Sequence, residues 1–118
     1  MDYNFEKFKN QAIQLKITLT DEISNKLLIY YKTLIEYNQV MNLTAITEFD
    51  GVFEKHFLDS IVLADYIDLN RRIKLIDVGT GAGFPGIPLK IFFPDLNILL
   101  VDSLNKRVKF LNEVILRL

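Results

Sequence analysis

The sequence contains no cysteine, and this absence rules out several kinds of site at once. Without thiols the chain can form no disulfide bond and can hold no metal ion through thiolate ligands. It also has no long apolar run, because residues 87–101, the most apolar region, are interrupted by prolines and charged side chains and cannot span a bilayer. The N-terminus lacks the apolar block of a signal peptide. We therefore expect a soluble protein of the cytoplasm.

Neither sign of charge dominates, since 14 lysines and arginines stand against 15 aspartates and glutamates. A net charge of −1 cannot steer the whole chain toward nucleic acid, so any such partner must meet a local basic patch. Six basic residues are candidates for that patch, although runs of this kind are more often plain solvated surface. They are Arg71, Arg72, Lys74, Lys106, Arg107 and Lys109.

The first 66 residues have the apolar spacing of helices and no strand pattern. We predict a short amphipathic helix over residues 2–15 and a long one over residues 21–41, with Thr20 as its N-cap. Thr47 is predicted to cap a third helical region that extends to about residue 66. Gly51 lies inside that region and costs about 1 kcal/mol relative to alanine, so we expect a kink or two short helices there. Residues 1–66 are thus predicted to form an N-terminal helical region.

The pattern changes after a basic turn at residues 70–72. An apolar, β-branched run at residues 73–78 predicts a buried strand, and Phe84-Pro85 opens a helix that Pro94 closes. Residues 97–101 predict a second buried strand, followed by a helix over residues 104–118. This order is a βαβα unit, whose two strands must be parallel and joined by a right-handed crossover. The predicted fold class is α/β, with residues 67–118 forming the start of a Rossmann-like domain.

Four of the five glycines lie in the short stretch between the first strand and the next helix. Glycine permits positive φ and lets a ligand approach the backbone closely. In a βαβ unit, ligands bind at the carboxyl ends of the strands, where Asp77 and Asp102 are expected. The acid after the second strand is well placed to accept hydrogen bonds from ribose hydroxyls. These features favour a nucleoside cofactor over a simple strand-to-helix turn.

Two nucleoside cofactors fit this loop in different ways. Residues 81–86 match the dinucleotide pattern GxGxxG, which would make the chain part of a nicotinamide-dependent oxidoreductase. That pattern presents N–H groups to a pyrophosphate, and Pro85 removes one of them. Asp77, two residues before Gly79, suits a positively charged amine instead. S-adenosylmethionine has that amine, a ribose and no phosphate, so the residues favour it. A non-enzymatic helical interaction module is a third alternative.

Several motifs resemble one known family. Four segments are similar to segments of the glucose-inhibited division protein B family, in the same order along the chain: YNQVMNLTAIT, EKHFLDSI, LIDVGTGAGFPGIPLKI and FPDLNILLVDSLNKRVKFL. That resemblance covers nearly the whole chain. It implies a class I methyltransferase fold and S-adenosylmethionine-dependent methylation of a guanine N7 in small-subunit ribosomal RNA.

The resemblance also implies roles for individual residues. Gly79 and Phe84 would contact S-adenosylmethionine and Asp102 would hold its ribose, while three further residues shape the same pocket. These three are Asp77, Gly81 and Gly83. No catalytic residue is expected, because guanine N7 has an in-plane lone pair and its methylation needs alignment of the reacting atoms and no general base. The target base would have to be unstacked or lie in an irregular RNA element.

The predicted sheet has only two strands, which is fewer than a stable Rossmann-like sheet requires. We therefore expect an N-terminal fragment with half a cofactor site, inactive by itself and binding S-adenosylmethionine weakly or not at all. An incomplete sheet also exposes an edge and apolar surface, which predicts possible self-association.

Three other groups of residues have a structural and a functional interpretation. His56, the only histidine, shares a helical face with Asp59 and either contacts RNA or cofactor or is a half-buried structural residue. Asn42 and Thr44 are expected to form a local turn. The tyrosines at positions 30, 31 and 37 are expected to pack in the core.

Overall fold

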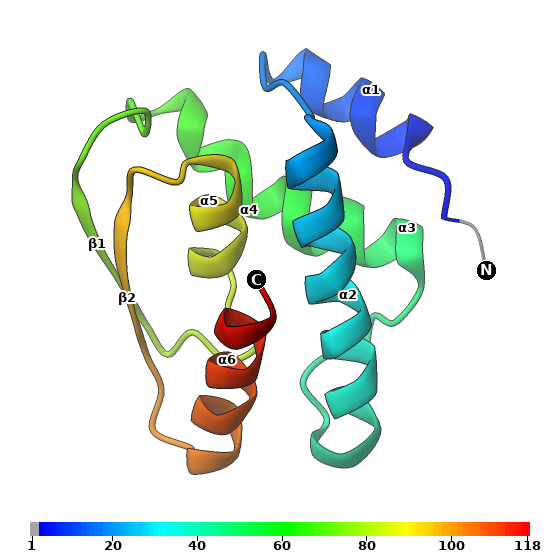
Figure 1. Ribbon diagram of the computed structural model, residues 1–118, viewed down its shortest axis with the longest axis vertical. Helices are drawn as coiled ribbons and strands as arrows, with labels where there is room; N and C mark the ends of the chain where they lie inside the picture. Colours follow the sequence, from blue (N-terminus) through cyan, green and yellow to red (C-terminus); the bar gives the residue numbers. More distant parts are fainter. Residues whose placement is uncertain (1–2) are drawn as a thin grey trace.

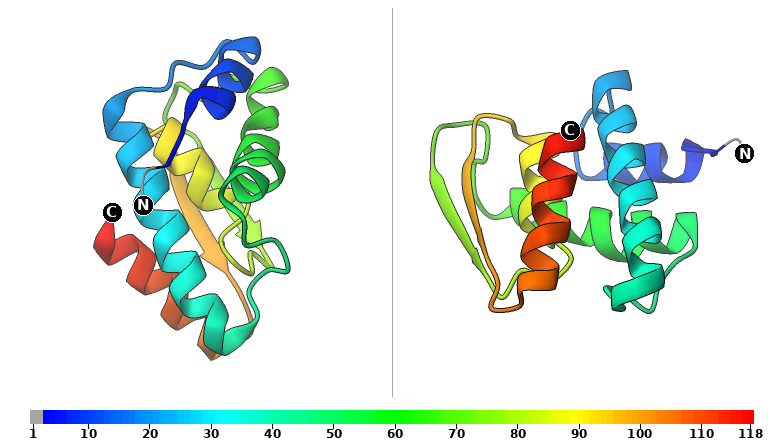
Figure 2. Two further views of the ribbon diagram at one scale, coloured as in Figure 1. Left: turned by 90° about the vertical axis from the view of Figure 1, so that its right-hand side faces the viewer. Right: turned by 60° about the horizontal axis from the view of Figure 1, so that its bottom comes forward.

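The computed structural model describes residues 3–118 and arranges them in successive layers (Figure 1). Strands β1 (Lys74–Val78) and β2 (Asn97–Val101) form the outer layer. Helices α5 (Gly86–Phe92) and α6 (Asn105–Arg117) cover one face of these strands. Helix α2 (Asp21–Met41) lies on the far side of α5 and α6 from the sheet, whereas the green helical segment that follows it passes behind α5 and α6 and leads back to β1 (Figures 1 and 2).

Helix α2 (Asp21–Met41) has the bounds that the sequence predicts. The Thr20 side chain accepts a hydrogen bond from the backbone N–H of Ile23, at 3.2 Å, which confirms Thr20 as the N-cap. The helix ends where Asn42 adopts a left-handed conformation with φ of 50°. Helix α1 (Glu6–Gln14) is shorter than predicted, and the first predicted helical residue lies outside the described residues.

The third helical region differs from its prediction in two respects. Helix α3 (Phe49–Val52) begins after Glu48, and the Thr47 side chain caps nothing, so the predicted cap is wrong. Helical backbone continues through Gly51 without a kink. A Cβ there would meet Ile46 Cγ2 at 2.9 Å, so this glycine serves close packing of the preceding loop.

The irregularity of this region lies further along the chain. A π-helical turn over Phe53–Leu58 follows α3, and α4 (Asp59–Ile61) and a 3₁₀ turn over Val62–Asp65 complete the run. The region is therefore not one regular α-helix, as expected, although Gly51 is not the reason.

The two strands pair in parallel, with Lys74 opposite Asn97 and Val78 opposite Val101. This register confirms the predicted α/β unit, with α5 as the crossover. The prediction that both strands are buried is wrong for one face, which lacks a covering layer among residues 3–118. Its large apolar side chains are exposed by 40–76%; they are Ile76, Val78, Leu99 and Val101.

One hydrophobic core joins the N-terminal helices to the βαβα unit. Tyr30 of α2 is fully buried and stacks on Phe57, with ring centroids 5.2 Å apart. Tyr31 is also buried and Tyr37 packs against Phe110, so the predicted core positions of the three tyrosines are confirmed. Arg117 ties α6 to α2 by an ion pair of 2.7 Å with Glu36.

Within residues 3–118, no helix is both long enough and apolar enough to cross a membrane.

The Thr20 cap leads to a testable prediction. Thr20→Ala should lower the free energy of unfolding by about 1 kcal/mol, because the N–H of Ile23 loses its side-chain acceptor. Urea denaturation followed by circular dichroism measures this change. Thr20→Ser keeps the hydroxyl and should stay close to the parent; equal losses in both variants would show that the hydrogen bond is not the cause.

Candidate functional site

The glycine loop, residues 79–86, begins at the carboxyl ends of both strands. Its first residues continue the pairing with β2, because the N–H groups of Gly79 and Thr80 donate to Val101 O at 2.7 and 3.1 Å. Gly79 and Gly81 have φ of 70° and 60°, which side chains other than glycine rarely adopt. A Cβ at either position would have no atom within 4 Å. The backbone is therefore open on this side, and a ligand can come into contact with it.

Asp77 holds the loop from within the protein. Its Oδ2 accepts hydrogen bonds from the Thr80 hydroxyl at 2.6 Å and from the Gly86 N–H at 3.0 Å. Gly86 permits this contact, since a Cβ there would collide with Leu100 and crowd Asp77 Oδ2. Asp77 Oδ1 accepts no hydrogen bond from residues 3–118 and is not sealed from solvent. One oxygen thus shapes the loop and the other remains available as an acceptor.

Asp102 connects the end of β2 to the glycine loop. Its Oδ2 accepts from the Gly81 N–H at 2.9 Å and its Oδ1 from the Leu104 N–H at 3.0 Å. These N–H groups, first that of Leu104 and then that of Gly81, lower the pKa of Asp102, and the nearby Arg107 lowers it further. The Arg107 guanidinium lies 3.6 Å from Oδ1, and the Asp102 side chain is only 2% exposed. The carboxylate is therefore shielded from solvent and already has three partners within this chain.

The start of α5 has no free backbone donor for a pyrophosphate. The Gly86 N–H is bonded to Asp77, the Ile87 N–H to Gly83 O at 2.8 Å and the Leu89 N–H to Pro85 O at 3.1 Å. Pro88, between them, has no N–H at all. The GxGxxG interpretation depends on these donors, so the geometry counts against a dinucleotide.

Tyr30 supports the loop from the helical side. Its hydroxyl donates a hydrogen bond to the carbonyl oxygen of Ala82, and both residues are buried. Burial, together with the negative charge of Asp77, raises the pKa of Tyr30 well above 10, so the hydroxyl keeps its proton and remains a donor. The sequence predicts only a core position for Tyr30. Its polar contact depends on tertiary structure and leaves no signal in the helical spacing.

His56 and Phe84 form a stacked pair between the glycine loop and the helical segment of residues 49–65, called the helical run below. Their ring centroids are 4.4 Å apart and the ring planes differ by 12°. His56 Nε2 is 2.8 Å from the Thr44 hydroxyl, which accepts from the Ile46 N–H at 3.0 Å. Burial lowers the pKa of His56 and the charge of Asp59 partly opposes this effect. The histidine is thus half-buried and structurally engaged, and Thr44 belongs to the local turn that the sequence predicts.

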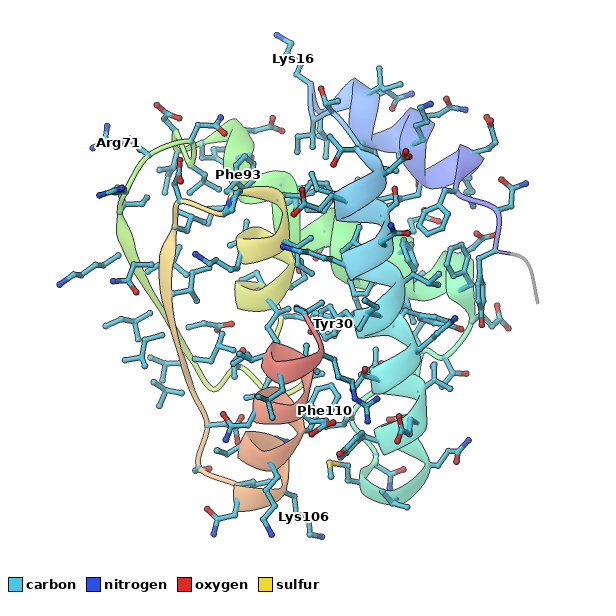
Figure 3. All side chains as sticks on the ribbon, in the orientation of Figure 1. Lys16, Tyr30, Arg71, Phe93, Lys106 and Phe110 are labelled. Carbon is cyan, nitrogen blue, oxygen red and sulfur yellow. The ribbon has the colours of Figure 1, made fainter. Side chains whose placement is uncertain are left out.

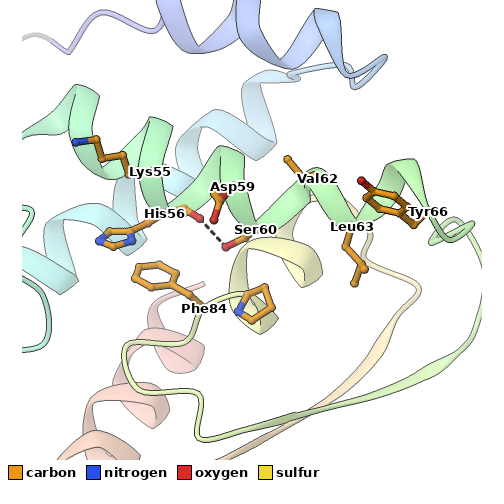
Figure 4. A pocket seen from close by; sticks show the side chains of 9 residues that line it. Lys55, His56, Asp59, Ser60, Val62, Leu63, Tyr66 and Phe84 are labelled. Carbon is orange, nitrogen blue, oxygen red and sulfur yellow. Dashed lines mark hydrogen bonds between the residues drawn. The ribbon is translucent and has the colours of Figure 1, made fainter.

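A groove of about 500 Å³ starts at this stacked pair and runs along the helical run (Figure 4). His56 reaches toward Phe84 from this run, and both His56 and Asp59 line the groove. The groove is lined by Lys55, His56, Asp59, Ser60, Val62, Leu63, Tyr66, Phe84 and Pro85. A second hollow of about 520 Å³ lies between α5, α6 and β2, and its lining is mostly aliphatic.

The six basic candidates do not form one patch. Figure 3 places Arg71 and Lys106 at opposite ends of the strands. Arg107 is engaged with Asp102, as described above. The two basic segments thus flank opposite ends of the βαβα unit, and this agrees better with solvated surface than with one phosphate-contacting patch.

Comparison with known proteins assigns the family. The family model described as GidB, rRNA small subunit methyltransferase G, matches residues 23–118. The chain belongs to this methyltransferase family. This assignment agrees with the resemblance seen in the sequence.

Three relatives carry the name ribosomal RNA small subunit methyltransferase G. The protein of Lachnoclostridium phytofermentans is 64% identical over 90 residues, covering 76% of this chain and 37% of the relative. That of Staphylococcus carnosus is 55% identical over 98 residues, covering 83% of this chain and 41% of the relative. That of Macrococcus caseolyticus is 50% identical over 111 residues, covering 94% of this chain and 47% of the relative. The chain thus spans less than half the length of these curated relatives.

The lowered pKa of His56 predicts a pH-dependent stability. The ordinary pKa of 6.5 applies to the unfolded chain, so between pH 7 and 5 the unfolded state binds more protons than the folded state. Acidification through this window should therefore lower the free energy of unfolding. Urea titrations at several pH values measure the slope. Since no other histidine is present, His56→Asn should flatten it, and an unchanged slope in that variant would contradict the assignment.

Proposed function

We propose that the natural protein carrying this sequence methylates a guanine N7 in small-subunit ribosomal RNA, with S-adenosylmethionine as the methyl donor. The observation that carries this proposal is the open backbone at Gly79 and Gly81, set between two strand-end carboxylates and beside a helix with no free N–H. Such a site suits a ligand with a ribose and a cationic amine, and offers nothing to a pyrophosphate. A ribosomal RNA substrate agrees with the names of the relatives, and it implies a location in the cytoplasm.

The proposed donor site uses the residues that meet at the glycine loop. Asp102 accepts hydrogen bonds from the ribose hydroxyls through the lone pairs that its two N–H partners leave free. Asp77 Oδ1 faces the amine, while its Oδ2 keeps the loop in shape. Gly79 and Gly81 let the ligand lie against the backbone, and Gly83 and Phe84 form the adjoining wall.

The chemistry asks little of the protein beyond orientation. S-adenosylmethionine supplies an electrophilic methyl group on a sulfonium ion. Guanine N7 presents an unprotonated lone pair in the plane of the ring. The chain's residues therefore have to fix the donor and align the base, and no proton needs to be removed first.

The donor site can be tested by NMR titration of the chain. S-adenosylmethionine should shift the amide signals of Gly79, Gly81 and Asp102, and NAD should not, because α5 has no free donors. Asp102→Asn should weaken the donor affinity about tenfold or more, since charged hydrogen bonds to the ribose are lost. Asp95→Asn, at the other end of β2, is the matched control. Loop shifts with NAD and none with S-adenosylmethionine would overturn the proposal.

The exposed sheet face is proposed to drive self-association of the chain. Val78 is 76% exposed within an apolar strip of two adjacent strands, and such strips pair readily with another molecule. Val78→Lys should shift the chain toward monomer in sedimentation equilibrium. Val40→Lys provides the control, because Val40 is equally exposed, at 79%, but lies on α2. A parent chain that is fully monomeric at high concentration would rule out this association.

A further inference from the structure

The groove between the helical run and Phe84-Pro85 has a lining that none of the loop contacts explains. It has a volume of about 500 Å³, which is within the range of small-molecule sites. One end lies at the His56–Phe84 stack, directly beside the proposed donor site. The other end reaches Tyr66, whose side chain is 80% exposed.

We propose that this groove holds the unstacked guanine of the RNA substrate, with Asp59 accepting hydrogen bonds from its Watson–Crick edge and Tyr66 stacking on the ring. The inference rests on the proposed methyl transfer to guanine N7 and names the residues that select the base. It assigns to the helical run a role in substrate choice that is separate from donor binding.

Asp59 has the chemistry that guanine requires. An ionised carboxylate only accepts hydrogen bonds, and guanine presents two adjacent donors, N1–H and N2–H, on its Watson–Crick edge. Adenine presents an acceptor at N1, which would face the carboxylate unfavourably. The other two aspartates near the loop, Asp77 and Asp102, are engaged by backbone N–H groups. Asp59 is exposed, and no residue among 3–118 makes a hydrogen bond or ion pair with its side chain.

The orientation of the base follows from the two walls of the groove. Asp59 belongs to the helical wall, and Phe84 and Pro85 form the wall that continues into the glycine loop. A guanine with N1–H and N2–H on Asp59 has N7 on its Hoogsteen edge, away from these donors, and this edge is proposed to face the loop. The atom to be methylated then faces the donor. Lys55, which also lines the groove, supplies a cation for the adjoining phosphate.

Tyr66 provides affinity without selecting the base. Stacking of a base on an exposed aromatic ring is worth about 1–3 kcal/mol and tolerates any base. Loss of the Tyr66 ring should therefore weaken all purines alike, whereas loss of the Asp59 charge should change the ratio between them. The two substitutions separate stacking from edge recognition.

The test is an NMR titration of the chain with 5′-GMP, IMP and AMP, with S-adenosylhomocysteine present so that nucleotides do not occupy the proposed donor site. The parent should bind GMP at least about fivefold more tightly than AMP, with IMP between them because it lacks the N2 donors. Asp59→Asn should reduce the GMP-to-AMP ratio toward one, and Asp59→Glu should restore part of it. Asp65→Asn changes an exposed acid of the same run that does not line the groove, and should leave the ratio unchanged.

The outcomes separate this inference from the proposed function. Equal affinities for the three nucleotides in the parent, or an unchanged ratio in Asp59→Asn, would overturn the inference even if S-adenosylmethionine binds the loop. Tyr66→Ala should weaken GMP and AMP by the same factor, and a base-dependent effect would contradict its assigned role. Guanine selectivity without any donor binding would leave the groove assignment standing and remove the methyl transfer.

Discussion

Asp77 Oδ2 lies between the sheet and the glycine loop and accepts hydrogen bonds from both ends of the loop, at Thr80 and at Gly86. The rest of the site depends on this interaction. Glycine adopts positive φ readily, but it loses more backbone freedom on folding than any other residue type. A buried, charged acceptor with two donors offsets this cost, since such hydrogen bonds contribute about 1.5–3 kcal/mol each. The loop is therefore shaped before any ligand arrives.

The N-terminal helices complete this arrangement from the opposite side. Tyr30 holds the carbonyl of Ala82, and His56 stacks on Phe84, so two side chains from the helical region contact two neighbouring loop residues. The hydrophobic core is continuous between the two parts of the chain. The helical region thus acts as a support for the loop, and its groove extends the same surface toward a substrate.

Local signals in the sequence predict the elements whose ends are set locally. Helix α2 begins at a threonine cap and ends at a residue that tolerates the left-handed conformation, and both features can be read from neighbouring residues. The residue type of Thr47 predicts a cap there, but α3 begins one residue later, after Glu48, whose side chain makes no capping hydrogen bond. Gly51 looked like a helix breaker, but a tertiary contact with Ile46 determines its presence. Whether a strand face is exposed depends on which other segments pack against it. The spacing of apolar residues along the strand carries no information about those segments.

In the candidate site, too, some features follow from the local sequence and others depend on tertiary contacts. The strand-end positions of Asp77 and Asp102 follow from the βαβα pattern, since parallel strands bring their carboxyl ends together. The internal hydrogen bonds of Asp77, the Tyr30–Ala82 contact and the stacked histidine depend on residues far apart in the chain. Tyr30 and Ala82 are 52 positions apart, a separation at which no pattern in the sequence indicates contact.

The central claim is that the helical region holds the glycine loop in a conformation ready for S-adenosylmethionine. The most direct measurement is the dissociation constant of S-adenosylmethionine for Tyr30→Phe, obtained by NMR titration alongside hydrogen exchange of the loop amides. The account predicts several-fold weaker binding and faster exchange at residues 79–83, because the buried carbonyl of Ala82 loses its donor. Tyr37→Phe, which removes a hydroxyl from the same helix away from the loop, should change neither. Unchanged affinity and unchanged exchange in Tyr30→Phe would contradict the account.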